Sequence, residues 1–283
     1  MHIIPLPNKT LICGELSLDL SQPQIMGILN VTPDSFSDGG QFHHKNNALA
    51  HAQKMIEEGA SIIDIGGEST RPHAAPVSIE EELARVVPVV EVLSQYPVVL
   101  SIDTSTPEVM RAAVAAGAHI WNDVRALKRP FALETAADLD IPIILMHMRG
   151  EPNTMNALAQ YEHVTQEVKA ELVERIDAAI AAGVRHEHII LDAGFGFAKN
   201  TAQNLKLLQE FWQLNELGYP LLSALSRKRF VGEVLNGADT AQRDIASVTG
   251  HLLSIQQGAS IVRTHNVKAM ADAIKMWQSM QNA

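Results

Sequence analysis

Short apolar runs that end in a polar or ionisable residue recur eight times along the chain of 283 residues. The runs, each with the residue that closes it, are 25–29 with Asn30, 62–63 with Asp64, 98–100 with Asp103, 119–121 with Asn122, 143–146 with His147, 189–191 with Asp192, 221–225 with Ser226 and 261–262 with Arg263. A continuous apolar run is typical of a parallel strand that is covered on both faces. Because polar groups at the carboxyl ends of such strands build the site of a (β/α)8 barrel, the pattern predicts a TIM barrel of the α/β class.

Segments with one apolar helical face lie between the predicted strands. Residues 48–56 and 164–180 carry apolar side chains at intervals of three and four, which predicts amphipathic helices. Four glycines end helical segments, as expected of a residue that readily adopts the left-handed conformation; they are Gly59, Gly117, Gly183 and Gly258. Pro88 is expected to kink the helix that begins after Ser78 or to split it in two.

The chain length fits one barrel domain over residues 1–283, with the barrel itself in about 24–280. Residues 9–20 alternate in polarity at Leu16, Leu18 and Leu20, which predicts an N-terminal β-hairpin that closes the bottom of the barrel. A doubly wound open sheet is the alternative fold. It is less favoured because no glycine-rich phosphate-binding fingerprint follows the first strand.

Composition narrows the classes of partner. The chain is 46% apolar and 19% charged, and its net charge of −10 argues against a binder of nucleic acid or of anionic membranes. A small anionic substrate stays possible, because a few local cations outweigh acidic groups beyond the Debye length of about 10 Å. Cys13 is the only cysteine, and neither a basic leader nor a membrane-length apolar segment is present. We therefore expect a cytoplasmic enzyme.

Two carboxylates and an amide lie at three different predicted strand ends. Taken singly, Asp103, Asn122 and Asp192 would each more often be a helix cap or a turn residue. If they converge in one pocket, they form a surface that accepts hydrogen bonds from a flat heterocycle with N–H and NH2 groups. Lys228 could donate to a carbonyl and a ring nitrogen of the same heterocycle.

The other predicted strand ends suggest an anion site and a loop that covers it. Arg263 and His265 follow the last strand, where barrels frequently hold a phosphate group. Residues 30–40 form a turn-rich segment with the single aromatic Phe36, which suits a mobile lid as well as an ordinary surface loop. In residues 66–72, two glycines allow close approach of backbone to a ligand, and Thr70 and Arg71 supply donors.

Histidines offer a competing interpretation as metal ligands. His186 and His188 have a spacing that could bind zinc, but they precede a strand and so lie on the face of the barrel that serves stability. His147 is equally compatible with packing and with pocket lining. The flanking Met146 and Met148 favour packing over a metal site.

Five segments closely resemble the dihydropteroate synthase family; they are residues 25–40, 66–72, 192–197, 226–228 and 263–265. The resemblance extends over roughly residues 20 to 280, and the first segment is specific in both length and order. It implies a (β/α)8 barrel that condenses 6-hydroxymethyl-7,8-dihydropterin diphosphate with p-aminobenzoate, with Mg2+, to give 7,8-dihydropteroate. It also implies sulfonamides as competitive inhibitors and a homodimer, to which the late apolar residues Ile274, Met276 and Trp277 could contribute.

The resemblance implies a role for each matching residue. The pterin would be held by Asp103, Asn122, Asp192 and Lys228, and the diphosphate by Arg263 and His265, with Asn30 on Mg2+ or the diphosphate. The p-aminobenzoate pocket would be shaped by Thr70, Pro72, Phe197 and Ser226, together with Phe36 of a lid that also contains Asp34 and Ser35. Arg71 and Met146 would be further substrate-binding residues. The catalytic residues would be Asp103, Lys228 and Arg263.

Three positions depart from the family pattern: Ala193, where proline is usual; Ala224, where glycine is frequent; and Asn266, where aspartate is common. None removes a group that the reaction needs, although Ala224 could narrow the p-aminobenzoate side. Two alternatives share the barrel: a pterin-binding methyltransferase that uses methyltetrahydrofolate and a corrinoid partner, and a catalytically silent paralogue. The diphosphate-binding residues and the lid favour the synthase over both.

Overall fold

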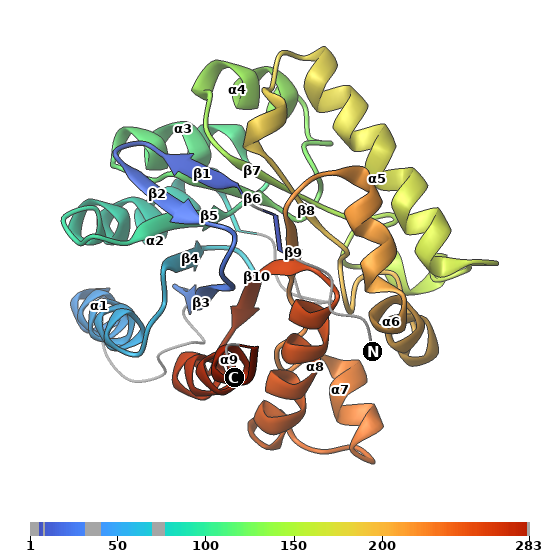
Figure 1. Ribbon diagram of the computed structural model, residues 1–283. Coiled ribbons are helices and arrows are strands. Elements are labelled where there is room, and N and C mark those ends of the chain that lie inside the picture. Colours follow the sequence, from blue (N-terminus) through green and yellow to red (C-terminus); the bar gives the residue numbers. More distant parts are fainter. Residues whose placement is uncertain (1–5, 8, 32–40, 70–76, 282–283) are drawn as a thin grey trace.

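Eight parallel strands close into a barrel in the computed structural model, which describes residues 6–7, 9–31, 41–69 and 77–281, without the side chains of 41–45 (Figure 1). The strands are β3 (Gln24–Asn30), β4 (Ile62–Gly66), β5 (Val99–Asp103), β6 (Ile120–Asp123), β7 (Ile143–Met146), β8 (Ile189–Asp192), β9 (Leu221–Ser223) and β10 (Ala259–Thr264). They follow chain order, and β10 pairs with β3 to close the ring. The barrel is confirmed, and the open-sheet alternative is wrong.

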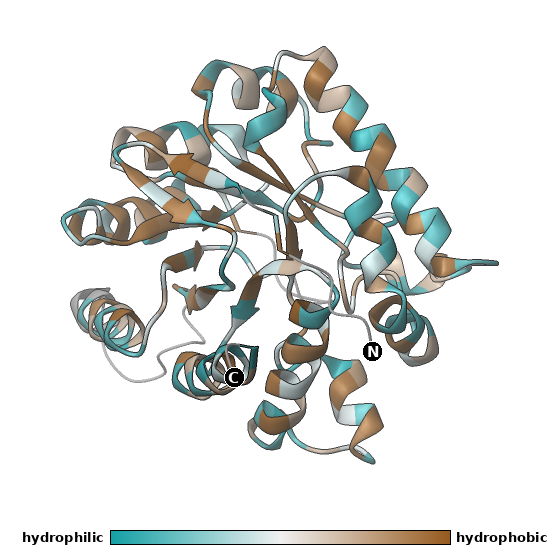
Figure 2. Cartoon of the chain, viewed as in Figure 1, coloured by the Kyte–Doolittle hydropathy of each residue, from teal (hydrophilic) through white to brown (hydrophobic). Residues whose placement is uncertain are grey.

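Helices surround the barrel on its outside (Figure 1). They are α1 (Gln41–Glu57), α2 (Ile79–Leu93), α3 (Pro107–Ala115), α4 (Ala132–Leu139), α5 (Val164–Ala181), α6 (Thr201–Gln209), α7 (Arg229–Val234), α8 (Asp244–Gln256) and α9 (Val267–Gln281), with short 3-10 helices at Met155–Leu158, His186–His188, Phe211–Leu217 and Thr240–Gln242. In Figure 2 the barrel strands are mainly brown, whereas the helices carry both colours, as expected of elements buried on one side only. None of the described helices is long and apolar enough to cross a membrane.

Alternate residues of each strand face two different cores. On β6, Trp121 lies in the large apolar core shared with the helices, whereas Ile120 lies in a second apolar core that contains residues of all eight barrel strands. On β5, Leu100 and Val99 divide in the same way. This alternation follows from the two-residue period of a strand. Every second residue along a strand therefore lines the interior of the barrel.

The N-terminal hairpin seals the end of the barrel where the strands begin. Strands β1 (Thr10–Cys13) and β2 (Leu16–Asp19) are antiparallel, and Figure 1 shows them across one end of the barrel. Leu11, Cys13 and Leu18 are buried in the same core as the inward residues at the beginnings of the strands. The predicted closure of the bottom is confirmed, which leaves the opposite end for the site.

Local sequence signals have mixed outcomes. The four predicted glycine stops all adopt positive φ, between 100° and 110°, at Gly59, Gly117, Gly183 and Gly258. Ser78 caps α2 by accepting a hydrogen bond from the backbone N–H of Glu81. Of the two outcomes predicted at Pro88, a kink or a split, the split is wrong, because α2 runs through Pro88 as one helix. Burial of Val86, Val89 and other apolar residues of this helix offsets the hydrogen bond that proline cannot donate.

Candidate active site

A layer of polar side chains lies inside the barrel at the carboxyl ends of the strands. In the parallel register, Asn30 of β3 pairs with Gly66 of β4, Gly66 pairs with Asp103 of β5, and Asp103 pairs with Asn122 of β6. A Cβ atom at Gly66 would lie 3.7 Å from Asn30 Oδ1 and 3.6 Å from Asp103 Cβ. Glycine at this position therefore leaves open space between the amide of Asn30 and the carboxylate of Asp103.

Arg263 ties two of these carboxylates together. Its Nε donates to Asp64 Oδ2 at 2.6 Å, and its Nη2 donates to Asp103 Oδ2 at 2.8 Å. Asp64 is fully buried and also accepts from Ser101 Oγ at 2.6 Å and from Asn122 Nδ2 at 3.2 Å. The arrangement is a buried, charge-assisted network that orients Asn122 and Asp103 in the same layer.

Asp64 is not at a strand end, contrary to the prediction. The strand β4 continues for two residues to Gly66, so Asp64 lies one layer deeper than Asp103. Two-residue alternation places its side chain inward, and Gly66 above it keeps the space clear. Sequence reasoning counted Asp64 in the repeat but assigned it no role in the site. Its signal was a carboxylate within an otherwise apolar run.

One carboxylate oxygen of Asp103 is available to a bound molecule. Its Oδ2 pairs with Arg263, whereas its Oδ1 is buried and has no hydrogen-bond partner within the described part of the chain. Burial raises the pKa of Asp103, the nearby guanidinium of Arg263 opposes that rise, and the carboxylate of Asp64 adds to it. A buried acceptor without a partner is costly, so this oxygen is poised to accept an N–H or O–H from a bound molecule.

Asp192 presents a second inward carboxylate, from β8. Burial raises its pKa to about 6, while a hydrogen bond from the backbone N–H of Gly194 to Oδ1, 2.8 Å long, lowers it in part. Gly194 has φ of 68°, and a Cβ there would lie only 1.9 Å from the carbonyl oxygen of His147. Only glycine fits this position, so the tight turn that supports Asp192 depends on it.

An apolar surface with a cation beside it adjoins the carboxylates. Met146 and Phe197 are buried in a small cluster with Val124, Met148, Met155 and Ala198. Lys228 places its Nζ 4.1 Å from the centroid of the Phe197 ring. Electrostatic attraction between an ammonium and a ring face holds the lysine over this surface. The three predicted side chains Met146, Phe197 and Lys228 therefore lie close to one another.

Ser226, in the loop after β9, and His265, directly after β10, form a pair. Ser226 Oγ lies 3.0 Å from His265 Nδ1 and also accepts from the backbone N–H of His265 at 3.2 Å. The hydroxyl of Ser226 has one proton and two lone pairs, so it can either donate to Nδ1 or accept a second hydrogen bond from an Nδ1–H. Burial, together with the positive charge of Arg263, lowers the pKa of His265 to about 3.

The departures from the family pattern have structural counterparts. Asn266 donates from Nδ2 to Asp244 Oδ2 at 2.9 Å, and the same carboxylate binds Arg227 through two hydrogen bonds, of 2.6 and 2.9 Å. Ala224 lies in the inner apolar core, and Ala193 lies in the outer core. Asn266 thus keeps a polar link between the loops after β9 and β10.

Several predicted positions lie outside the described residues. These are Asp34, Ser35 and Phe36 of the lid, together with Thr70, Arg71 and Pro72.

The two histidines considered as zinc ligands contact other side chains: His188 lies 3.4 Å from Asp140, and His186 lies 2.7 Å from the Tyr219 hydroxyl. Within the described residues no cluster of three His, Cys, Asp or Glu side chains could hold a metal ion.

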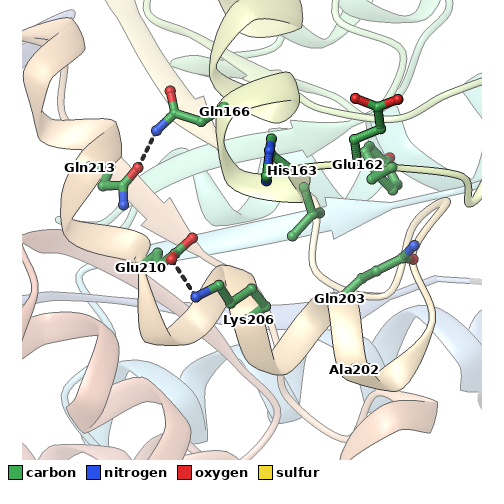
Figure 3. A pocket seen from close by; sticks show the side chains of 10 residues that line it. Glu162, His163, Gln166, Ala202, Gln203, Lys206, Glu210 and Gln213 are labelled. Atoms are coloured by element: carbon green, nitrogen blue, oxygen red, sulfur yellow. Dashed lines mark hydrogen bonds and ion pairs between the residues drawn. The ribbon is translucent and has the colours of Figure 1, made fainter.

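A pocket of about 430 Å³ on the outer surface is separate from this layer (Figure 3). It lies between the start of α5 and α6, where Gln166 bonds Gln213 and Lys206 pairs with Glu210. Its lining residues are Tyr161, Glu162, His163, Val164, Gln166, Ala202, Gln203, Lys206, Glu210 and Gln213. None of these residues belongs to the polar layer at the carboxyl ends of the strands. The candidate active site is therefore that layer and not this pocket.

The chain is similar to known proteins over most of its length. The family described as pterin binding enzyme matches residues 26–265. A dihydropteroate synthase of Haemophilus influenzae is 51% identical over 267 residues, which cover 94% of this chain and 97% of that protein. The structure of Xanthomonas albilineans dihydropteroate synthase with 4-aminobenzoic acid has a TM-score of 0.93 and 49% identity, covering 98% and 100% of the two chains. That of Yersinia pestis dihydropteroate synthase with a sulfonamide drug has a TM-score of 0.92 and 47% identity, covering 97% and 100%.

Proposed function

The chain belongs to the pterin-binding enzymes and, among them, to the dihydropteroate synthase family, and from this premise we propose which of its residues hold each reactant. The reaction is the condensation of 6-hydroxymethyl-7,8-dihydropterin diphosphate with p-aminobenzoate to 7,8-dihydropteroate and diphosphate. The observation that carries the proposal is the buried, unpartnered Oδ1 of Asp103 within the described part of the polar layer. The methyltetrahydrofolate-dependent alternative has no support among the relatives compared above.

The pterin would lie across the polar layer. Its 2-amino-4-oxo ring offers N–H and NH2 donors, for which the inward carboxylates of Asp103 and Asp192 are acceptors. The amide of Asn122, held by Asp64, can meet a donor or an acceptor of the ring. Lys228 would donate to the ring carbonyl from its position over Phe197.

The diphosphate would lie toward the end of β10. With Ser226 donating to its Nδ1, neutral His265 would offer its Nε2–H to a phosphate oxygen. Arg263 uses Nε and Nη2 on Asp64 and Asp103, and its remaining N–H groups would donate to a phosphate oxygen. Asn30 supplies one amide oxygen, which fits Mg2+ held mainly by the diphosphate and water, as that ion prefers. When bound, Mg2+ would neutralise charge on the leaving diphosphate.

The chemistry would proceed by dissociative substitution. The bond between the pterin methylene carbon and the diphosphate oxygen breaks, and its electron pair leaves with the diphosphate. The nitrogen lone pair of p-aminobenzoate then forms the C–N bond, and that nitrogen loses a proton to water. Asp103 in its ionised form stabilises the transient positive charge on the pterin, and Arg263 stabilises the negative charge on the leaving group. No strong general base is required, because an arylamine attacks as a neutral nucleophile.

The p-aminobenzoate ring would rest beside the apolar surface of Met146 and Phe197, near Ser226. The segments 34–36 and 70–72 would complete this side, as the family resemblance implies. Sulfonamides would compete here, which the sulfonamide complex of the Yersinia pestis relative supports.

We propose that the enzyme works as a homodimer in the cytoplasm. On α9, Met276 is 73% exposed and Met280, one turn later, is 55% exposed, whereas Ile274 and Trp277 pack against the core of their own chain. Two large apolar side chains on one exposed helix face favour a covered surface. Met276→Glu with Met280→Glu should shift sedimentation toward a monomer if α9 contributes to the dimer, and an unchanged dimer would exclude this face.

Release of diphosphate that requires p-aminobenzoate tests the activity. Purified protein receives the pterin diphosphate, with and without p-aminobenzoate and with and without Mg2+, and free diphosphate is measured over time. We expect release only when both organic substrates and Mg2+ are present. Diphosphate release that is independent of p-aminobenzoate would indicate a hydrolase, and no release would refute the assignment.

A further inference from the structure

A buried lysine lies directly beneath the site, in the loop between β8 and α6. This loop doubles back through three residues with positive φ: 68° at Gly194, 78° at Gly196 and 47° at Ala198. Lys199 follows them and is only 3% exposed. Its Nζ lies 3.0 Å from the carbonyl oxygen of Gly194, 3.0 Å from that of Phe197 and 2.9 Å from His147 Nδ1.

The three contacts require a specific set of protonation states. A lysine ammonium has three protons and no acceptor, so three acceptors use it fully. Neutral His147 then accepts at Nδ1 and donates from Nε2 to Glu171 Oε2, 3.0 Å away. Glu171 is itself paired with Arg149, through Nε at 2.8 Å. Burial, together with the charge of Lys199, lowers the pKa of His147 to about 4, which agrees with a neutral ring.

We propose that Lys199 is a positioning residue for the pterin site, closing the loop 194–199 with its three protons so that Asp192 and Phe197 keep their places; this rests on the proposed function. Both ends of the loop that it joins carry site contacts. Gly194 donates its N–H to Asp192 Oδ1, and the ring of Phe197 faces Nζ of Lys228. Asn204 holds the middle of the loop, accepting from the N–H of Gly196 at 2.7 Å.

Charge on Lys199 distinguishes this role from ordinary packing. Burial lowers its pKa to about 7, which the carboxylates of Asp192 and Glu171 oppose in part. The charged and titratable groups that face it are Asp192, His147, Glu171, Arg149 and Lys228. When Lys199 loses its proton, one of the three acceptors loses its donor and Asp192 loses a nearby positive charge. Pterin affinity should therefore decline as the pH rises above about 7.

The test compares Lys199→Met with Lys206→Met, both in the purified full chain. Lys206 lies on the exposed side of α6, where it pairs with Glu210. The control substitution therefore removes a lysine from the same region without altering the site. Calorimetric titration with 6-hydroxymethylpterin, which lacks the diphosphate, measures affinity in the folded protein. We expect the dissociation constant to rise about tenfold to hundredfold in Lys199→Met and by less than about twofold in Lys206→Met.

The pH profile separates positioning from a purely structural role. Between about pH 7.5 and pH 9, above the range in which Asp192 ionises, wild-type affinity should fall about threefold to tenfold more than that of Lys199→Met. If Lys199→Met does not fold, Lys199→Gln, which keeps two N–H donors, should show a smaller loss of affinity and the same lesser alkaline decline. Wild-type affinity and pH dependence in a folded Lys199 variant would overturn the proposal and leave the function intact. Absence of pterin binding by the wild type would overturn both.

Discussion

Replacing Asp64 with asparagine tests whether a buried carboxylate that need not touch the substrate holds the pterin site together. The substitution keeps the size and shape of the side chain and removes its negative charge. Asp64 accepts from Arg263 Nε and Ser101 Oγ, both at 2.6 Å, and from Asn122 Nδ2 at 3.2 Å. In Asp64→Asn the amide oxygen can keep Arg263 and Asn122, while the new amide donates to the hydroxyl of Ser101.

The expected cost follows from the charge that is lost. A hydrogen bond to a charged group contributes about 1.5–3 kcal/mol and a neutral one about 0.5–1.5 kcal/mol. Arg263 keeps Asp103 as a partner, so the loss stays below the roughly 3–5 kcal/mol typical of a buried charge left alone. We therefore expect the free energy of unfolding to fall by about 2–3 kcal/mol. Pterin affinity should fall as well, because Asn122 and Arg263 lose the anchor that orients them.

Denaturant unfolding with a matched surface variant checks the magnitude. Asp140 is an exposed aspartate that pairs with Arg185 at 2.7 Å and ends α4 with φ of 50°, a conformation that asparagine tolerates. Asp140→Asn should cost less than about 1 kcal/mol. If Asp64→Asn were as stable as Asp140→Asn and bound pterin like the wild type, the charge of Asp64 would not be what orders the network.

Four further outcomes are expected. Asp192→Asn should weaken pterin binding by about 2–4 kcal/mol, since a charge-assisted acceptor becomes partly a donor; unchanged calorimetric affinity would remove this residue from the pocket. The N–H donors of the pterin bind ionised carboxylates better than protonated ones, and burial raises the pKa values of Asp103 and Asp192, the latter to about 6. Pterin affinity should therefore rise as the pH increases through the pKa values of these two groups. Calorimetry in buffers of different ionisation enthalpy should detect the protons released on binding. Chelation of Mg2+ should abolish turnover but leave binding of diphosphate-free pterin unchanged; loss of both would contradict a metal held through diphosphate. p-Aminobenzoate should bind weakly to the free enzyme and more tightly with pterin, diphosphate and Mg2+ present, and equal affinities in equilibrium dialysis would contradict an ordered site.

The sequence by itself determined the elements and their arrangement. Apolar runs predicted the beginnings of the eight strands to within two residues, because strands buried on both faces consist mainly of apolar side chains. Glycine stops and the alternating hairpin were equally local signals. Asp103, Asn122 and Asp192 were found because a polar residue that follows an apolar run marks a strand end in this fold.

Only the tertiary structure decided which polar groups meet. Arg263 pairs with Asp64 across 199 residues of sequence and with Asp103 across 160, because β10 lies beside β3 when the barrel closes. Lys199 bonds His147 across 52 residues, because β7 and β8 are neighbours. No local pattern encodes such pairs. Propensity and periodicity describe a few residues at a time, whereas burial of a charge is favourable only where a distant partner completes it.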